Sequence, residues 1–310
     1  MQVHTDPAQI PSFRQAVITI GTFDGVHLGH RMIIGQLVAV AAAVGGESVL
    51  ITFHPHPRQI VQPETAPLRL LTSLAERQQR LAALGVDHLV VIPFTEAFAS
   101  MEAAEFIASF LVQQFRPHTI IIGHDHRFGR GRHGDYQMLE TAATHYGFTV
   151  LEMDAALLRQ AAISSTRIRE ALLAGEVTLA NELLGYAYTF GGRVVPGKQR
   201  GRTIGFPTAN LEVSDETEKL MPADGVYAVR IGYGGQTFDG MMNLGKRPTV
   251  DGQRHTTEVH LFDFDGDLYG QHLDVSVEAR IRNEERFSSL EALQRQLSHD
   301  RKAILKLLHR

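Results

Sequence analysis

The first 185 residues alternate short apolar runs with longer segments of helical period. The runs are rich in β-branched residues and show no regular polar alternation, which is typical of strands buried on both faces of a parallel sheet. They lie at 16–20, 48–53, 88–93, 119–123 and 148–151. Because strands and helices alternate along the chain, the pattern predicts an α/β, doubly wound domain.

Local signals place helices between these runs. Ser73 and Glu76 have the spacing of a capping box at a helix start. Asp135 is a candidate N-cap for a helix that ends before Gly147. Between 101 and 115 the apolar positions fall on one helical face, which predicts one further helix against the sheet.

The pattern changes near residue 185. Strand-like runs then follow one another without long helices, and glycines and prolines separate them. These runs lie at 189–195, 225–231, 237–243, 258–264 and 273–281. Short strands in series predict a small antiparallel barrel or sandwich. A helix with a capping box at 288–291 is expected to end the chain. We therefore predict two domains, 1–185 and 186–310.

Composition and charge limit the cellular location and the classes of partner to expect. The chain has no cysteine, so a disulfide scaffold is excluded and a reducing, cytoplasmic location is expected. Its first ten residues lack the apolar core of a signal peptide, and no apolar stretch approaches the length of a membrane span. The net charge is −4, so we expect no nucleic-acid partner and no membrane partner.

Candidate chemistry follows the predicted parallel strands. Ligands of open α/β sheets bind beyond the carboxyl ends of the strands. Four segments that follow strands carry polar or cationic side chains: 21–30, 53–57, 123–129 and 163–169. Their shared position at one edge of the sheet favours a common site over four unrelated surface loops.

The segment 21–30 is the most informative of the four. It joins a strand to a helix through a glycine turn, and the first N–H groups of a helix attract anions. His27 and His30 are three residues apart, and Gly29 between them lets a phosphate approach the backbone. The histidines could instead bind a metal or simply be exposed, but a third metal ligand is not evident and no cysteine exists. The pattern favours a site for a nucleotide α-phosphate.

Two glycine-rich segments match nucleotide motifs without the required context. Gly129 to Gly134 reads G-x-G-x-x-G, yet it does not open a helix directly after a strand. A phosphate-contacting loop or a solvated turn is the better interpretation. Gly192 to Lys198 begins like a P-loop, but Gln199 replaces the hydroxyl residue that holds magnesium.

The motifs together resemble the prokaryotic bifunctional riboflavin kinase/FMN adenylyltransferase family, also called FAD synthetases. The matching pieces are 21–30, 52–57, 123–129, 163–169, 201–210, 222–227, 242–249, 258–260, 267–270 and 282–287. The resemblance implies a Rossmann-like nucleotidyltransferase domain followed by a riboflavin kinase β-barrel. Riboflavin and ATP would give FMN in the barrel, and FMN and a second ATP would give FAD and pyrophosphate in the first domain.

The resemblance also implies residues for adenylyl transfer. His27 and His30 would be catalytic at the α-phosphate. The other residues implied in ATP or phosphate binding are Gly21, Phe23, Asp24, Gly29, Asp125, Ser165, Thr166 and Arg169. Of these, Ser165, Thr166 and Arg169 match the motif that holds the β- and γ-phosphates. One departure is His126, which stands where the family usually has phenylalanine.

For the kinase, the resemblance implies Glu258 as the catalytic base. Thr208 and Asn210 would hold Mg²⁺ and ATP, since oxygen ligands suit this metal. The residues implied near the ATP phosphates are Gly197, Gly201 and Arg202, and those implied near the flavin are Asn243, Arg247 and Arg282. Without the resemblance, Glu258 reads as an exposed strand residue.

Two alternatives remain open from the sequence. One is a nucleotidyltransferase whose barrel has lost its activity, although Thr208, Asn210 and Glu258 are intact. The other is a nucleotide-binding domain joined to an RNA-binding barrel, with 198–202 as the basic contact. Such barrels usually stack bases on aromatic side chains, and this chain has no tryptophan. The oligomeric state is not predicted.

Overall fold

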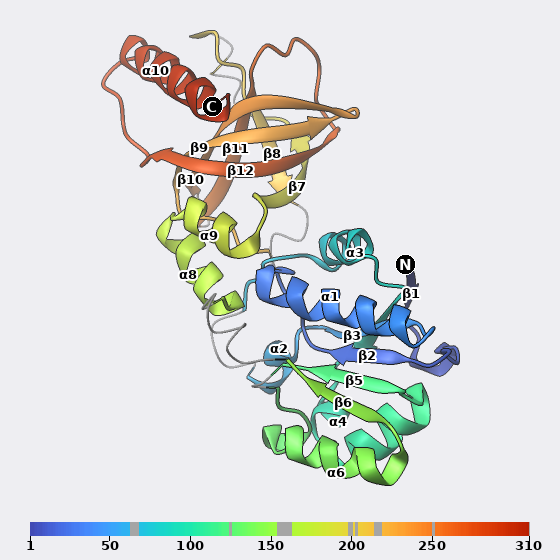
Figure 1. Cartoon of the computed structure of the whole chain (residues 1–310). Helices are drawn as coiled ribbons and strands as arrows, with labels where there is room; N and C mark the ends of the chain where they lie inside the picture. Colours follow the sequence, from blue (N-terminus) through green and yellow to red (C-terminus); the bar gives the residue numbers. More distant parts are fainter. Residues whose placement is uncertain are drawn as a thin grey trace. The chain divides into compact units, whose positions relative to one another are not determined.

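The computed structural model describes residues 1–62, 68–123, 126–153, 163–197, 201, 204–213, 219–249 and 252–309, without the side chains of 246–249 and 252–255. The chain divides into two compact units, Met1–Ser165 and Thr166–Arg310 (Figure 1). Each unit is described by itself.

The N-terminal unit is built on a parallel sheet of six strands. The strands are β1 (Gln2–His4), β2 (Val17–Ile20), β3 (Ser48–His54), β4 (His88–Pro93), β5 (Thr119–Ile122) and β6 (Thr149–Glu152). Their order across the sheet is β1-β4-β3-β2-β5-β6, and every neighbouring pair is parallel. The doubly wound prediction is therefore confirmed. The edge strand β1 was not predicted, because its three residues carry no apolar pattern.

Alternate residues of the strands enter two separate cores. Val17 lies in the core on one face of the sheet, with Ile34 and Leu37 of α1. Ile18 lies in the core on the other face, with Phe106. Figure 1 shows α1 and α3 over one face and α4 and α6 over the other. This division explains why the strands read as continuous apolar runs.

The helices of this unit follow the local signals. They are α1 (Leu28–Ala43), α2 (Pro57–Val61), α3 (Leu74–Ala83), α4 (Glu96–Ala99), α5 (Ala103–Glu105) and α6 (Tyr136–Tyr146), with short 3₁₀ turns at Pro7–Gln9 and Arg130–Arg132. Ser73 and Asp135 cap α3 and α6 as predicted, and Gly147 ends α6 in the left-handed conformation. The helix expected at 101–115 differs: Phe106–Gln113 has π-helical pairing, a wider turn that buries four apolar side chains.

The second unit is a closed antiparallel barrel, which confirms the predicted fold. Its strands are β7 (Tyr188–Val195), β8 (Ala209–Val213), β9 (Gly225–Tyr233), β10 (Gln236–Thr249), β11 (Gly252–Leu261) and β12 (His272–Arg282). Around the barrel they run β10-β11-β8-β7-β12-β9. β8 overlaps the motif at 207–210, whose Thr208 and Asn210 we expect on one side of a strand, but it is too short to stand out among the strand-like runs.

The described part of the chain places these helices with the barrel: α8 (Ser165–Ala174), α9 (Val177–Leu184) and the C-terminal α10 (Leu290–Leu308). The Asn181 side chain of α9 donates to the carbonyl oxygen of Val277 at 2.9 Å, which fixes α9 to β12. The N-cap of α10 is Ser289, one residue later than predicted. The compact units divide after the first residue of α8, between Ser165 and Thr166, whereas the sequence places the boundary between the reactions near 185.

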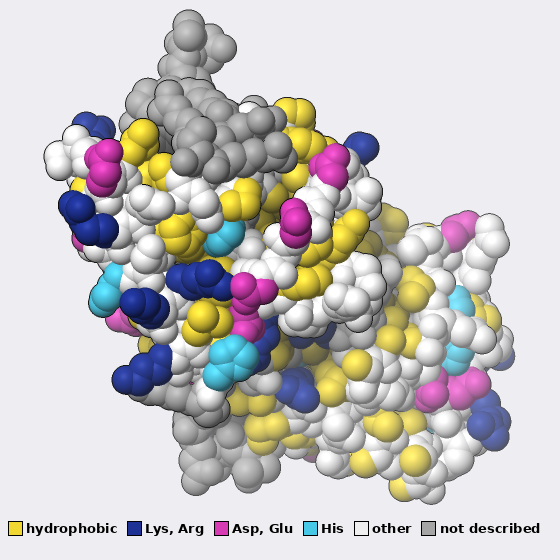
Figure 2. All heavy atoms as spheres, turned by 90° about the horizontal axis from the view of Figure 1, so that it is seen from above, with side chains coloured by type: hydrophobic (Ala, Val, Ile, Leu, Met, Phe, Trp, Pro, Cys, Tyr) yellow, Lys and Arg dark blue, Asp and Glu magenta, His cyan; other side chains and the backbone are white. Residues whose placement is uncertain are grey.

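Charges of both signs are mixed on the face of the molecule in Figure 2. Basic and acidic side chains of the described residues alternate there with apolar ones. Among the described residues, we find no helix with the length and hydropathy that a transmembrane span requires.

Candidate functional site

A cavity of about 1000 Å³ opens in the N-terminal unit beyond the carboxyl ends of the parallel strands. It is lined by Gly21 to Phe23 after β2, Phe53 at the end of β3 and His56 after it, Phe94 after β4, and Gly123 after β5. The strand order reverses between β2 and β5, where ligands of doubly wound sheets bind. The predicted edge of the sheet is therefore hollow and accessible to a ligand.

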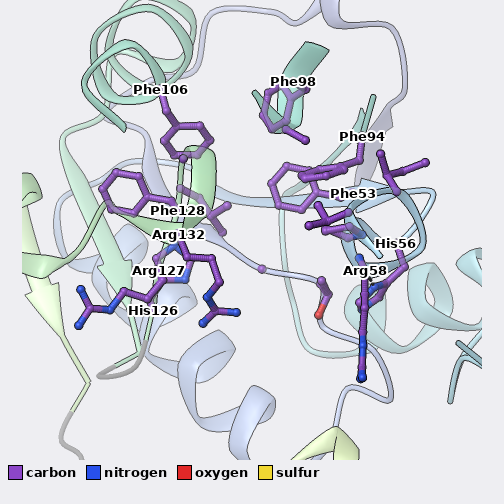
Figure 3. Close-up of a pocket in the computed structure, with 18 of the residues that line it drawn as sticks. Phe53, His56, Arg58, Phe94, Phe98, Phe106, His126, Arg127, Phe128 and Arg132 are labelled. Carbon is purple, nitrogen blue, oxygen red and sulfur yellow. Dashed lines mark hydrogen bonds between the residues drawn. The ribbon is translucent and has the colours of Figure 1, made fainter. Parts of the chain in front are cut away.

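One wall of the cavity is aromatic. Phe53, Phe94 and Phe98 form a cluster with ring centroids 5.4–5.7 Å apart. Phe106 and Phe128 lie nearly parallel at 5.2 Å on another part of the wall (Figure 3). Rings placed in this way suit a large flat ligand, because aromatic faces stack favourably.

Basic side chains reach the cavity from two sides. Figure 3 shows His56 and Arg58 on one side and His126, Arg127 and Arg132 on the other. The guanidinium of Arg127 lines the cavity and also forms an ion pair with the carboxylate of Asp135, at 3.0 Å. The ring of His126 lies nearly parallel to Phe128 at 6.0 Å, so the substituted position still presents a flat ring. An aromatic wall with a basic rim fits a flat ligand that carries phosphate.

His27 and His30 lie at the start of α1, as the motif requires. Their rings stack with centroids 3.6 Å apart, and His27 caps the helix by accepting the N–H of His30 at its Nδ1 atom, at 3.2 Å. A neutral ring that accepts at Nδ1 carries its proton on Nε2, where it can donate to an anion. The N–H groups of Leu28 and Gly29 precede the first hydrogen bond of the helix, from Arg31 to His27. N–H groups at the start of a helix are suited to bind an anion.

The charge state of His30 follows from its surroundings. Burial is the largest cause that lowers the pKa of His30 well below the usual histidine value, and the fields of His27 and Arg77 act in the same direction. The Nδ1 atom of His30 is buried and has no hydrogen-bond partner in the described part of the chain. His30 is therefore neutral near pH 7, and its ring lines the cavity.

The side chain of Asp24 points into the protein rather than toward a bound phosphate. Its carboxylate is fully buried and accepts the backbone N–H groups of Leu71 and Thr72, each at 3.0 Å. The hydroxyl of Ser165 donates to the carbonyl oxygen of Asp24 at 3.0 Å. Asp24 thus fixes the loop before α1 to residues 71–72, and Ser165 contacts that loop.

The other residues predicted for adenylyl transfer are placed as follows. Gly21 and Phe23 line the cavity, whereas Gly29 is buried within α1. Thr166 and Arg169 lie in α8, which belongs to the second compact unit. Asp125 lies outside the described residues. The assignment of these residues to ATP stays a prediction.

In the barrel, three polar side chains stand in one row across neighbouring strands. Glu258 of β11 pairs in register with Asn210 of β8 and with Asn243 of β10. Opposite residues of antiparallel strands share a face, with Cβ atoms about 5 Å apart. The Thr208 hydroxyl donates to Oε2 of Glu258 at 3.1 Å. Glu258 is half-buried rather than exposed, so its carboxylate has the setting of a site residue.

A second cavity, of about 510 Å³, is lined by Ala209 and Val259, which neighbour the row on the opposite face of their strands, and by none of the three residues of the row. Thr208 lines it, together with Pro207 and the turn from Phe264 to Tyr269. Gly197 approaches the row closely, because a Cβ atom at this position would collide with the side-chain amide of Asn210. Gly201 likewise packs against the carbonyl oxygen of Phe206. Both glycines are therefore required by the path of the chain.

The residues predicted to contact flavin differ from one another in their hydrogen-bond partners. The guanidinium of Arg282 holds the carboxylate of Asp300 at 2.9–3.2 Å, which fixes α10 to β12. The amide of Asn243 donates to Glu284 at 2.8 Å. Arg247 lies in β10, but its side chain is outside the described part, as is all of Arg202. Flavin binding by these residues stays a prediction.

Several residues of both sites were missed by sequence reasoning. The aromatic wall comes from four separate segments, and each phenylalanine alone reads as core. Leu71 and Thr72 bind Asp24 from 47 and 48 residues away, and no local pattern marks such a contact. Glu284 could have been noticed, since it lies within the motif 282–287.

Comparisons with known proteins cover nearly the whole chain. Residues 9–167 match the family model described as FAD synthetase, and residues 184–308 match the one described as riboflavin kinase. The bifunctional riboflavin kinase/FMN adenylyltransferase of Escherichia coli K12 is 41% identical over 285 residues, which is 92% of this chain and 90% of that protein. The protein of the same description from Pseudomonas fluorescens is 40% identical over 292 residues, 94% of this chain and 92% of that protein.

A solved structure has the same fold over both units. It is described as a macrolide-efflux protein from Streptococcus pneumoniae, is 33% identical and has a TM-score of 0.87. The match covers 97% of this chain and 98% of that one. Its description names a different activity from that of the curated relatives.

Proposed function

Because the chain belongs to the bifunctional riboflavin kinase/FMN adenylyltransferase family, we propose that its two sites carry out these two reactions in succession. Residues 186–310 would phosphorylate riboflavin with ATP, and residues 1–185 would adenylylate the FMN formed. The observation that carries the proposal is the pair of sites, one at the carboxyl edge of the parallel sheet and one on the barrel.

In the adenylyl transfer, a phosphate oxygen of FMN attacks the α-phosphorus of ATP. The bond from that phosphorus to the bridging oxygen breaks, and pyrophosphate leaves. The transition state spreads negative charge over its oxygens, so it needs fixed donors rather than a protein nucleophile. Nε2 of His27, the ring of His30 and the start of α1 supply these donors. The aromatic wall and the basic rim of the larger cavity would hold FMN.

In the kinase, the 5′-hydroxyl oxygen of riboflavin attacks the γ-phosphorus of ATP, and ADP leaves. Glu258 would take the hydroxyl proton, which is general base catalysis. Its half-buried carboxylate is oriented by the Thr208 hydroxyl. Asn243 stands on the other side of Glu258 in the same row, where it would contact the flavin.

Magnesium is the metal that the kinase residues fit. The hydroxyl of Thr208, the amide of Asn210 and the carboxylate of Glu258 form an oxygen set on adjacent strands. Hard oxygen ligands suit Mg²⁺, which usually retains waters and shares the phosphates of ATP. We propose that Thr208 and Asn210 hold it. When bound, the ion neutralises the phosphate charge that develops during transfer.

An RNA-binding barrel is the less favoured alternative. RNA barrels use basic grooves with aromatic stacking faces, whereas charges of both signs are mixed on the face in Figure 2. The larger aromatic cavity lies in the α/β unit instead.

Incubation of the purified chain with riboflavin, ATP and Mg²⁺ tests the proposal. Chromatography should show FMN first and FAD later, and omission of Mg²⁺ should stop the conversion. Supplied FMN should give FAD without riboflavin. If neither flavin forms under any of these conditions, the proposed function is wrong.

A further inference from the structure

One charged side chain of the N-terminal unit has no part in the reactions described so far. Arg77 of α3 is only 2% exposed. Its Nη1 atom donates to the hydroxyl of Thr52 at 3.3 Å, while its Nε atom is buried without a hydrogen-bond partner in the described residues. A guanidinium stays charged in proteins, and an incompletely paired buried charge is costly. A neutral side chain of similar size would avoid this cost.

Arg77 lies directly behind the loop that precedes α1. The Thr52 hydroxyl that receives its hydrogen bond donates in turn to the carbonyl oxygen of Thr22, at 3.1 Å. Thr22 lines the larger cavity. A chain of two hydrogen bonds therefore runs from α3 through the end of β3 to the wall of the site.

The loop that Arg77 supports has a strained backbone. Phe23 and Val26 have φ angles of 47° and 38°, in the left-handed region that side chains with a Cβ atom avoid. Such conformations cost about 1–3 kcal/mol each and persist only where the surroundings hold them. Contacts from the residues packed against this loop are therefore needed to hold its backbone in this conformation.

Arg77 also sets the electrostatics of this loop. Burial lowers the pKa of its guanidinium, and the carboxylate of Asp24 acts in the opposite direction, so the two charges lie close enough to interact. The charged or titratable groups whose fields reach His30 are the adjacent His27 and Arg77 of α3. A fixed positive charge here adds to the positive end of the α1 dipole.

We propose that Arg77 is a positioning residue for adenylyl transfer, which holds the 21–26 loop through Thr52 and gives the α-phosphate site a permanent positive field. The inference rests on the proposed adenylyltransferase function. ATP itself would not touch Arg77. Its charge would act on ATP through the loop and through His30, which it keeps unprotonated.

The test compares Arg77→Met, which removes the charge at similar size, with Arg77→Lys, which keeps it. Arg80→Met is the matched control, because it makes the same change one helical turn along α3. FAD formation from FMN and ATP is measured against pH, and riboflavin phosphorylation by the same preparation reports on the second unit.

For Arg77→Met we expect kcat/KM for ATP in FAD formation to fall by about tenfold, less than the loss of a direct donor to the transition state. The acid limb of the pH profile should move to higher pH, because His30 is then protonated more easily. Arg77→Lys should restore most of the rate and the original limb. Arg80→Met and all FMN formation should match the wild type.

Several outcomes would overturn the inference. One is a wild-type rate and pH profile in Arg77→Met. Another is an equal loss of FAD formation in Arg77→Lys and Arg77→Met with an unmoved acid limb, because that result indicates a packing role only. If Arg77→Met does not fold, Arg77→Lys decides: an acid limb displaced although the charge is kept contradicts the proposal. A wild-type protein that makes no FAD would refute the proposed function itself.

Discussion

At the scale of residues, the protein places neutral groups where anions are expected. His27 and His30 stack 3.6 Å apart, so two positive rings would repel each other strongly. The burial and the neighbouring charges that depress the pKa of His30 resolve this conflict. With His30 neutral, the pair can donate hydrogen bonds to phosphate without placing two positive rings in contact.

The depressed pKa of His30 predicts an acid-sensitive stability. Above the unfolded-state pKa of about 6.5, His30 is neutral in both states and contributes nothing to pH dependence. As the pH falls below that value, the unfolded chain binds the proton first, so the free energy of unfolding decreases until the folded pKa is passed.

Urea unfolding followed by circular dichroism at several pH values measures this effect. His30→Gln should lose less stability than the wild type between neutral and acidic pH. His145→Gln, a change at an exposed position, should keep the wild-type slope. Equal slopes in all three proteins would show that His30 titrates normally.

Glu258→Gln tests the base of the kinase. The amide keeps the size of the side chain but cannot take the riboflavin proton, so FMN formation should fall by about 10²–10⁴-fold. Conversion of supplied FMN to FAD should be unchanged. The control is Glu212→Gln, which makes the same change at an exposed position of β8. A fully active Glu258→Gln protein is incompatible with the assignment.

Thr208→Ala tests the metal site. The loss of even an outer partner of a metal site weakens binding by about tenfold or more. We therefore expect the Mg²⁺ concentration for half-maximal FMN formation to rise by at least about tenfold. Thr237→Ala, at an exposed position of β10, should leave the Mg²⁺ titration as in the wild type. An unchanged titration in Thr208→Ala would exclude this ligand.

At the scale of elements, α10 is fixed to the barrel by one buried ion pair. The Asp300 carboxylate is 1% exposed, and it receives three guanidinium contacts from Arg282 and one amide contact from Gln296. The pair explains why an arginine of a family motif has a structural partner 18 residues away. The sequence motif alone did not indicate this pairing.

Asp300→Asn should destabilise the barrel unit by about 3–5 kcal/mol, because it leaves the half-buried Arg282 without its counter-charge. Urea unfolding monitored by circular dichroism measures the loss. Asp263→Asn is the control: Asp263 binds Arg301 at the surface, and such exposed pairs contribute about 1 kcal/mol or less. Similar effects of the two changes would contradict the proposed anchoring role.

The elements that the sequence predicted are those with strong local signals. Buried parallel strands, the capping box at Ser73 and the cap at Asp135 were all readable from short windows. The sequence did not predict β1, because pairing with β4, rather than its own residue pattern, makes it a strand. The π-helical turns of 106–113 escaped because apolar spacing does not distinguish them from an α-helix.

At the scale of the whole molecule, the site residues that sequence reasoning found lie in motifs, and the missed ones connect distant segments. The backbone N–H groups of Leu71 and Thr72 bind Asp24 in the loop before α1, and the field of the buried Arg77 reaches His30. These residues lie about 50 positions away from the loop in the sequence. Their roles follow from tertiary contacts alone. The central claim remains that the chain carries two separate sites, one for each reaction.

Mixing two single variants tests that claim most directly. With riboflavin, ATP and Mg²⁺, Glu258→Gln alone should form FMN only at its strongly reduced rate, and His30→Ala alone should accumulate FMN. The mixture should make FAD, because each protein supplies the site that the other lacks. Two separate sites would be contradicted if either variant alone formed FAD from riboflavin as fast as the mixture, or if the mixture formed no FAD.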